Sequence, residues 1–146
     1  IGTDTIYTRI IDERFPDYQS VIPTDNEKEI KASCADLLSA VKRVSIFSNK
    51  ATHQIAIRAA KGSATITTED PEKASKAQET IDIEYDGESI DVGYNAAYLK
   101  DILAHMKSDK IVVKLNTPIS AGLFYPTSLS NDAEITMLLM PIRLND

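Results

Sequence analysis

The stretches KEIKASCADLLSAVKRVSIFS (residues 28–48) and SIDVGYNAAYLKDILAHM (residues 89–106) follow the same pattern. Each opens with the alternation of a β-strand and continues with apolar residues at the spacing of an amphipathic helix. A helix-capping residue stands at each junction, Ser33 in the first stretch and Asn95 in the second, 62 positions apart. The sequence therefore predicts an internal repeat whose halves each begin with a strand and a helix.

Three further strands are predicted after each helix, from period-two alternation and β-branched residues. In the first half they span residues 53–60, 63–69 and 80–86, with a tight turn at Lys61 and Gly62 and a polar loop over residues 70–79. In the second half they span residues 110–116, 119–125 and 134–142. Helices on one side of antiparallel sheets make an α+β domain, here built from two βαβββ-type halves.

The N-terminal residues differ from both halves. TIYTRIID, residues 5–12, is rich in β-branched residues and predicts a strand. Pro16 and Pro23 then bracket QSVI, and proline disfavours the centre of a sheet because it has no backbone donor. We place a domain boundary here, with residues 1–20 before it and residues 21–146 after it. The chain begins with Ile1 rather than a methionine, which is expected of a fragment.

The composition limits the possible partners. The formal net charge of -6 and the pI near 4.9 disfavour tight electrostatic binding to nucleic acid. The single cysteine, Cys34, cannot form an internal disulfide, which fits a reducing, cytoplasmic location. The longest apolar run, residues 137–142, is too short to span a bilayer, so no membrane role is expected.

Residues that could carry chemistry are scattered. His53 and His105 lack the spacing of metal ligands, and Cys34 has no second cysteine or base beside it, so a buried structural thiol is expected. Solvated charge is the expectation for acidic residues in predicted turns, namely Glu69, Asp70 and Asp109. The sequence contains no glycine-rich phosphate loop and no nucleophile elbow. It therefore predicts a non-catalytic protein that holds no cofactor and no metal.

Three features allow two interpretations each. EITMLLMPI (residues 134–142) is apolar at both parities, so the strand is either buried on both sides or lines a partner groove with one face. Tyr98 is either an aromatic at the edge of the core or part of such a groove. Four cations on the polar helix faces are either solvated charge or a stripe that faces DNA: Lys42, Arg43, Lys100 and Lys107.

Four segments resemble, in order and spacing, the bacterial DNA polymerase sliding clamp, the beta subunit of DNA polymerase III: RIIDERFPDYQSVIP (9–23), LLSAVKRVSIFSN (37–49), DVGYNAAYLKDIL (91–103) and MLLMPIRL (137–144). The resemblance implies a clamp domain, with residues 1–20 as the last strand of the middle clamp domain and the connector, and residues 21–146 as the third domain. It also implies a homodimer ring that encircles double-stranded DNA, contacts it nonspecifically and acts as a processivity factor in DNA replication.

The resemblance further implies a groove for short peptides from the replicative DNA polymerase, the clamp loader and repair polymerases. The matching positions come from the connector, the second helix, the penultimate strand and the tail: Pro16, Ser20, Val21, Asn95, Tyr98, Ile119, Ala121, Leu138, Leu139, Met140, Pro141, Ile142, Arg143 and Leu144. This favours the groove interpretation of the last strand. The subunit contact is matched by Ile46 and Phe47, at the end of the first helix.

The chain also departs from the family pattern. Residues 72–79 read EKASKAQE, with Lys73 and Lys76 in a stretch where well-studied members place several acids, so the charge pairing across the subunit contact is expected to differ. Ser20 stands where an arginine is common, which leaves the groove rim less basic. The alternative function is a stand-alone peptide-binding module without a DNA role, whereas a small hydrolase using Cys34 or a histidine has little in its favour.

Overall fold

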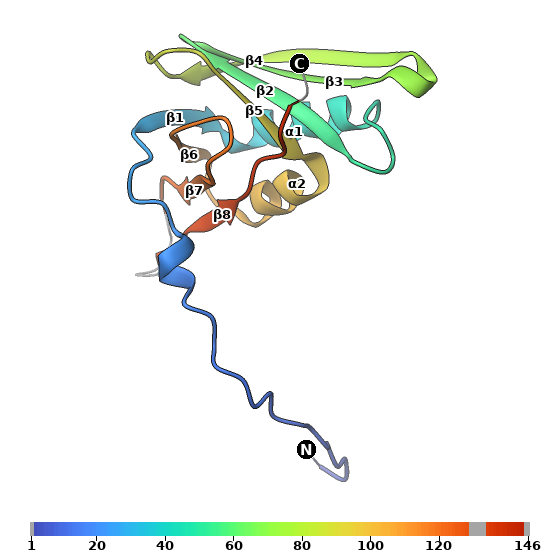
Figure 1. The fold of residues 1–146 in the computed structure, drawn as a ribbon, viewed down its shortest axis with the longest axis vertical. Helices are drawn as coiled ribbons and strands as arrows, with labels where there is room; N and C mark the ends of the chain where they lie inside the picture. Colours follow the sequence, from blue (N-terminus) through green and yellow to red (C-terminus); the bar gives the residue numbers. More distant parts are fainter. Residues whose placement is uncertain (1, 129–133, 145–146) are drawn as a thin grey trace.

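Two helices pack beside an antiparallel sheet, and an extended N-terminal segment leads away from them (Figure 1). The computed structural model describes residues 2–128 and 134–144. The first half contains β1 (Lys28–Ser33), α1 (Cys34–Ser45), β2 (Gln54–Ala60), β3 (Ser63–Asp70) and β4 (Ser75–Glu84). The second half contains β5 (Ile90–Asn95), α2 (Ala96–His105), β6 (Lys110–Leu115), β7 (Gly122–Pro126) and β8 (Met137–Leu139). Short 3-10 turns occupy Tyr18–Val21 and Pro71–Lys73.

The predicted repeat is confirmed at both helix starts. The Ser33 side chain accepts a hydrogen bond from the Asp36 amide at 3.3 Å. The Asn95 side chain accepts from the Ala97 amide at 2.9 Å and from the Tyr98 amide at 3.4 Å. These bonds satisfy amides that have no partner inside the helix, so both helices begin where the sequence predicts.

Strand order in the described part of the sheet is β5-β2-β3-β4-β1-β6-β7-β8. The first strand of each half therefore joins the other half, since β5 runs beside β2 and β1 beside β6. Within the first half, β1 pairs with β4 at only two positions, Lys31–Glu84 and Ala32–Ile83. A bridge between Gly93 and Ile142 takes the matching place in the second half, because Gly93 is the repeat counterpart of Lys31.

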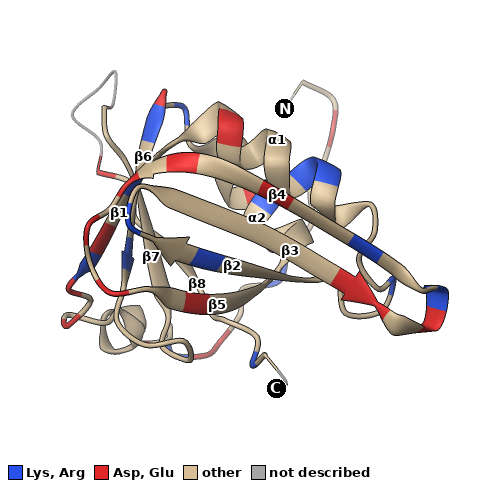
Figure 2. Cartoon of the chain, turned by 90° about the horizontal axis from the view of Figure 1, so that it is seen from above, with Lys and Arg blue, Asp and Glu red and all other residues tan. Residues whose placement is uncertain are grey.

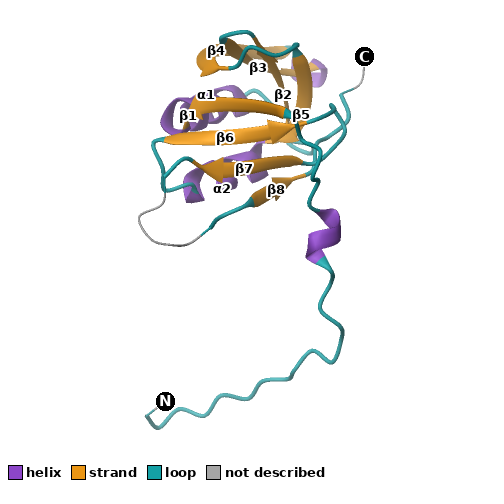
Figure 3. Cartoon of the chain, turned by 90° about the vertical axis from the view of Figure 1, so that its left-hand side faces the viewer, coloured by secondary structure: helices purple, strands orange, loops and turns teal. Residues whose placement is uncertain are grey.

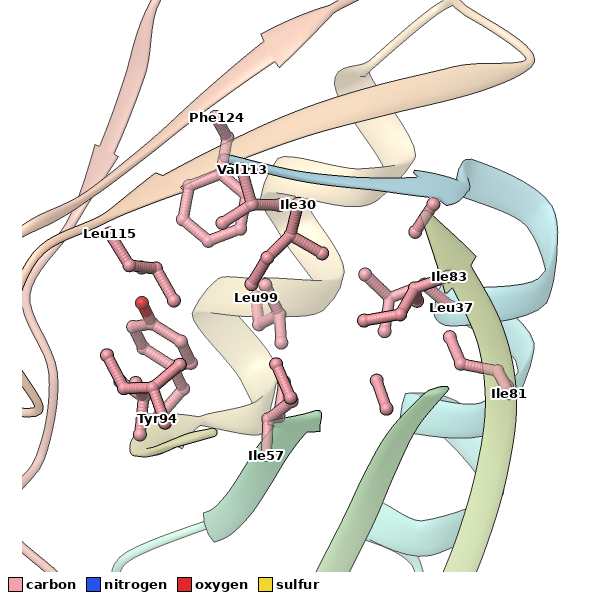
Figure 4. A pocket seen from close by; sticks show the side chains of 15 residues that line it. Ile30, Leu37, Ile57, Ile81, Ile83, Tyr94, Leu99, Val113, Leu115 and Phe124 are labelled. Carbon is pink, nitrogen blue, oxygen red and sulfur yellow. The ribbon is translucent and has the colours of Figure 1, made fainter. Parts of the chain in front are cut away.

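Both helices lie on one side of the sheet and pack against each other (Figure 3). Apolar side chains from both halves fill the space between helices and strands, the largest being Phe124, Ile55, Ile66, Leu99, Leu103 and Ile111. An apolar cavity of about 40 Å³ remains within this core (Figure 4). It has room for roughly one water and no polar lining, so the interior is a packed core and not a ligand site. The predicted α+β architecture, with two helices on one side of antiparallel strands, is confirmed.

One prediction about strands is wrong, and another is not tested by this chain. Residues 5–12 are exposed and form no strand here, because no strand lies beside them among the described residues. Residues 70–79 are not one loop: Asp70 ends β3, and after the Pro71–Lys73 turn residues 75–79 form the first half of β4, which pairs with β3 from Asp70–Ser75 to Ser63–Asp82. Polar composition misled the prediction because this strand is half-exposed along most of its length, and tertiary pairing overrides local propensity.

The last two strands are shorter than predicted. Strand β7 begins at Gly122, because Pro118 and the bonds between Thr117 and Ser120 form a turn before it. Ile119 and Ala121 therefore precede the strand instead of lying on it. Strand β8 covers only Met137–Leu139 of the predicted 134–142, and residues 129–133 lie outside the described residues.

Cys34 is buried as predicted, and its thiol donates to the Leu103 carbonyl oxygen at 3.3 Å. Burial raises the pKa of this thiol, which disfavours the reactive thiolate. The expectation of solvated charge is wrong for Asp70, which is 1% exposed at the end of β3. It holds for Glu69 and Asp109, which are exposed.

Candidate functional site

The C-terminal tail lies across the edge of β5. The Ile142 amide donates to the Gly93 carbonyl oxygen at 2.8 Å, and a Cβ atom at Gly93 would collide with the Ile142 carbonyl oxygen and the Leu144 side chain. Only glycine permits this approach, so the tail's path is built into β5. Within the tail Leu139 is buried, Met140 is 61% exposed, and Pro141 and Ile142 are half-buried.

An open surface cavity of about 420 Å³ adjoins the tail. It is lined by Asp91, Pro118, Ile119, Arg143 and Leu144. Three of the predicted groove residues therefore share one hollow, although Ile119 and the tail are separated by more than twenty positions in the sequence. The cavity combines apolar walls with an exposed cation and a carboxylate at its rim, as sites for short peptides commonly do.

The buried neighbours of this cavity hold its walls in place. Ala121 is 8% exposed, and its carbonyl oxygen accepts from the Asn26 side chain at 2.9 Å. Leu138 and Leu139 pair with Leu123 and Gly122 of β7. These predicted groove residues support the surface from beneath or from the side, and Leu139 belongs to the core.

The start of α2 contributes an exposed aromatic ring. Tyr98 is 61% exposed, so its ring is not part of the core. Asn95 fixes the position of Tyr98 by capping the helix, and its side-chain amide also donates to the Thr52 carbonyl oxygen at 3.3 Å. Helix α2 contacts β8, so the helix and the last strand lie in one region of the molecule.

The connector residues Pro16, Ser20 and Val21 lie below the domain, where the N-terminal segment enters it (Figure 1). All three are exposed, and their hydrogen bonds stay within the connector: Tyr18 to Pro16 at 2.9 Å and Ser20 to Asp17 at 2.7 Å. They do not line the cavity beside the tail. The membership of these three residues in the groove stays a prediction.

A second apolar surface lies at the end of α1. Ile46 is 70% exposed and Phe47 is 45% exposed. Beside them runs β4, which bonds to β3 on one side and meets β1 only at Ile83 and Glu84. No strand among the described residues pairs with its other edge from Ser75 to Asp82, and this edge is called the free edge of β4. The predicted strand over residues 80–86 includes the end of this edge, but residues 75–79 were predicted as a loop, although Ala77 continues the alternation of Ile81 and Ile83.

Lys and Arg positions are spread among Asp and Glu positions over the chain (Figure 2). The four predicted DNA-facing cations differ in their surroundings. Arg43 makes a two-pronged ion pair with Glu79 of β4, which raises the pKa of Arg43 and lowers that of Glu79. Lys100 is half-buried and donates to the Ser45 hydroxyl at 3.4 Å. Lys42 is exposed on α1, and Lys107 lies beyond the end of α2 instead of on the helix.

No cluster of three metal-ligating side chains occurs among residues 2–128 and 134–144. Within the same residues, no helix is long and apolar enough to cross a membrane.

A duplicated α+β domain with both helices on one side of its sheet is the domain of sliding clamps. The structure of this chain matches that of the C. crescentus beta sliding clamp with a TM-score of 0.87 at 31% identity, and the match covers 94% of this chain and 36% of that one. The Pseudomonas aeruginosa sliding clamp gives a TM-score of 0.86 at 29% identity, covering 92% of this chain and 36% of that one.

The family model described as "DNA polymerase III beta subunit, C-terminal domain" matches residues 19–143, and the chain belongs to this family. The beta sliding clamp of Proteus mirabilis is 33% identical over 142 residues, which is 97% of this chain and 38% of that protein. The Vibrio cholerae beta sliding clamp is 30% identical over 137 residues, 94% of this chain and 36% of that protein. The chain thus spans little more than a third of the length of these relatives.

Proposed function

We propose that this chain is the C-terminal part of a DNA polymerase sliding clamp, a non-catalytic processivity factor that works in the cytoplasm. The carrying observation is the family match over residues 19–143 together with the duplicated fold. A ring around duplex DNA raises processivity by tethering the polymerase, which keeps its effective concentration at the template high. No cofactor is needed for this task.

Residues 1–20 would then complete a preceding domain. Within residues 2–20 the large apolar side chains are exposed: Ile6, Tyr7, Ile10, Ile11, Phe15 and Tyr18. Such a run of exposed apolar groups in a strand-like sequence is unusual on a free surface. It supports the assignment of this segment as the last strand of a middle clamp domain followed by a connector.

The surface beside the tail would bind short peptides of the replicative polymerase, the clamp loader and repair polymerases. Support comes from the exposed side chains of Tyr98, Ile119 and Met140 and from the cavity that Leu144 and Arg143 help to line. Apolar peptide side chains would be desolvated against these groups. The tail's approach to Gly93 holds part of the surface in place before binding.

The surface at the end of α1 would contact a second subunit in a homodimer ring. Ile46 and Phe47 offer apolar area, and the free edge of β4 offers unpaired backbone groups to an incoming strand. Lys73 and Lys76 lie at this surface and already pair with Asp70 and Glu69 within the chain. The charge pairing across the contact would therefore rest on other groups.

Contact with double-stranded DNA would be weak and nonspecific. Lys42, Arg43, Lys100 and Lys107 are few, and Arg43 is already paired. Together with a net charge of -6, this favours sliding over tight phosphate binding.

The test is retention on DNA of the full-length protein that contains this chain. A clamp loaded on nicked circular DNA should remain bound at high salt and should be released when the DNA is linearised. A full-length protein that is monomeric, and is never retained on circular DNA while still binding a polymerase peptide, would favour the stand-alone peptide-binding module instead.

A further inference from the structure

The buried polar residues gather at one corner of the molecule. Apart from Cys34 and the tyrosines of the core, the buried polar side chains among the described residues are Ser48, Thr68 and Asp70, at 4%, 6% and 1% exposure. All three lie where α1 ends, β2 begins and β3 ends. Ser75 of β4 pairs with Asp70 and donates to the Phe47 carbonyl oxygen, so this corner adjoins the end of α1 that carries Ile46 and Phe47.

Asp70 is poorly compensated for so buried a carboxylate. Its Oδ1 atom accepts one long hydrogen bond from the Asn49 side chain, at 3.4 Å. Its Oδ2 atom accepts no hydrogen bond from the described residues, and the Lys73 ammonium lies 3.7 Å away. Burying a carboxylate with so few partners is costly, and ion pairs of this kind contribute little to stability. Stability alone does not account for Asp70.

Asn49 connects Asp70 to the turn after α1. The Asn49 side-chain oxygen accepts from the Ala51 amide at 2.9 Å and from the Thr52 amide at 3.3 Å, while its nitrogen donates to Asp70. The Asn49 side chain thus holds the turn through its oxygen, and Asp70 holds the Asn49 side chain through its nitrogen.

Two further bonds fasten the same turn to the β3–β4 hairpin. The Ser75 hydroxyl donates to the Phe47 carbonyl oxygen at 3.2 Å, and the Thr68 hydroxyl donates to the Gln54 carbonyl oxygen at 2.6 Å. Asp70 and Ser75 pair across the hairpin, so the end of the hairpin bonds to the segment after α1 at two points, Asn49 through Asp70 and Phe47 through Ser75.

We propose that Asp70, acting through Asn49, is a positioning residue for the subunit contact: it holds the turn that carries Ile46 and Phe47 in the orientation that a second subunit binds. This inference rests on the proposed function. If the turn were free to leave this orientation, the apparent affinity between subunits would fall by the fraction of time that the turn spends correctly placed.

The experiment compares Asp70→Ala and Asp70→Asn with Asp86→Ala, which removes an exposed carboxylate at the opposite end of β4. Each change is made in the full-length subunit. Subunit dissociation is measured by analytical ultracentrifugation, polymerase-peptide affinity by fluorescence polarisation, and amide exchange of residues 46–53 by mass spectrometry. Thermal melting reports on the fold.

Asp70→Ala should raise the subunit dissociation constant about tenfold and speed amide exchange at residues 46–53, with peptide affinity unchanged. Asp70→Asn keeps an oxygen that can accept from Asn49, so it should restore most of the subunit affinity. Asn49→Ala, at a half-buried site, should match Asp70→Ala, and the double variant should add little because the two side chains act as a unit.

Unchanged subunit affinity in Asp70→Ala would overturn the inference, as would equal losses of melting temperature, peptide binding and subunit affinity. Failure of the unaltered full-length protein to self-associate would instead overturn the proposed function, so the two failures are distinguishable.

Discussion

The two halves of the repeat end in strands of very different form. Strand β4 spans ten residues, bonds to β3 along its length and leaves its other edge free. Strand β8 spans three residues, after which the tail passes Pro141 and crosses to Gly93. A long free edge suits a strand from another subunit, whereas a short strand with an outward apolar tail suits a peptide. Under the proposed function, the difference between these two strands would give one domain two docking surfaces.

The largest effect should come from placing charge at the surface formed by the end of α1 and the free edge of β4, where it should weaken association between subunits. Replacing Ile46 and Phe47 with Asp in the full-length subunit should weaken ring assembly by about 4 kcal/mol, roughly a thousandfold, because unpaired carboxylates would be buried. Sedimentation measures the assembly. Ala35→Asp, exposed at the other end of α1, serves as the control. Loss of polymerase-peptide binding in the double variant would contradict the separation of the two surfaces.

The second surface should respond to Tyr98→Ala or to removal of residues 140–144. Either change should weaken binding of a polymerase C-terminal peptide by about 2 kcal/mol, or some thirtyfold, since exposed aromatic anchors dominate such sites. Fluorescence polarisation gives the affinity. His105→Ala, at the opposite end of α2, should leave it unchanged. Full affinity in both altered chains would remove the groove assignment.

Gly93→Ala tests whether the tail's path matters for that surface. The added methyl group would meet the Ile142 carbonyl oxygen and Leu144, so the tail would have to move away from β5. We expect a loss of about 1 to 2 kcal/mol in the free energy of unfolding, with weaker peptide binding. Urea denaturation and polarisation measure the two effects. A variant as stable and as peptide-competent as the original chain would mean that the tail's position is immaterial.

Much of the fold could be predicted, because the elements of the repeat are marked by local signals such as helix caps, turn residues and apolar periodicity. Ser33 and Asn95 cap their helices as expected, and Gly62, with φ of +76°, makes the predicted turn between β2 and β3. The first half of strand β4, residues 75–79, escaped prediction because SKAQE is polar and its pairing with β3 is a tertiary effect, whereas residues 80–84 lie in the predicted strand 80–86. A run of alternating half-buried positions looks like a loop when only composition is considered.

The candidate sites were less predictable than the fold. The resemblance to clamps, not periodicity, gave the groove residues, and the structure brings Ile119, Arg143 and Leu144 to one cavity. Asp70 was expected in solvent, because nothing in DPEK indicates that the α1–β2 turn folds over it. Burial of a charged residue depends on contacts distant in sequence, which local patterns do not encode.

Tyr94 offers a smaller test, in the core that the two halves share. Its hydroxyl is buried with no hydrogen-bond partner among the described residues, and burial raises its pKa. Tyr94→Phe removes an unsatisfied polar group and should therefore raise the free energy of unfolding by about 1 kcal/mol. Urea denaturation provides the measurement. A clear loss of stability would mean that the hydroxyl has a partner, such as a buried water.

The smallest effect on stability is expected from an ion pair that α1 makes and α2 does not. Arg43 of α1 binds Glu79 of β4, whereas the matching position in α2 is His105, whose ring nitrogen lies 2.7 Å from the Asp101 carbonyl oxygen. The Arg43 contact lowers the pKa of Glu79 below the 4.5 of the free side chain. Glu79 therefore stabilises the fold above that value, and this contribution is lost as the pH falls through its lower folded pKa. Because the pair is exposed to solvent, Glu79→Gln should reduce stability only slightly at neutral pH and not at all in strong acid. Urea midpoints of the original chain, of Glu79→Gln and of the exposed control Glu88→Gln, measured across the acid range, test this expectation. If Glu79→Gln remained less stable than the original chain in strong acid, Glu79 would act through packing against α1 instead of through its charge.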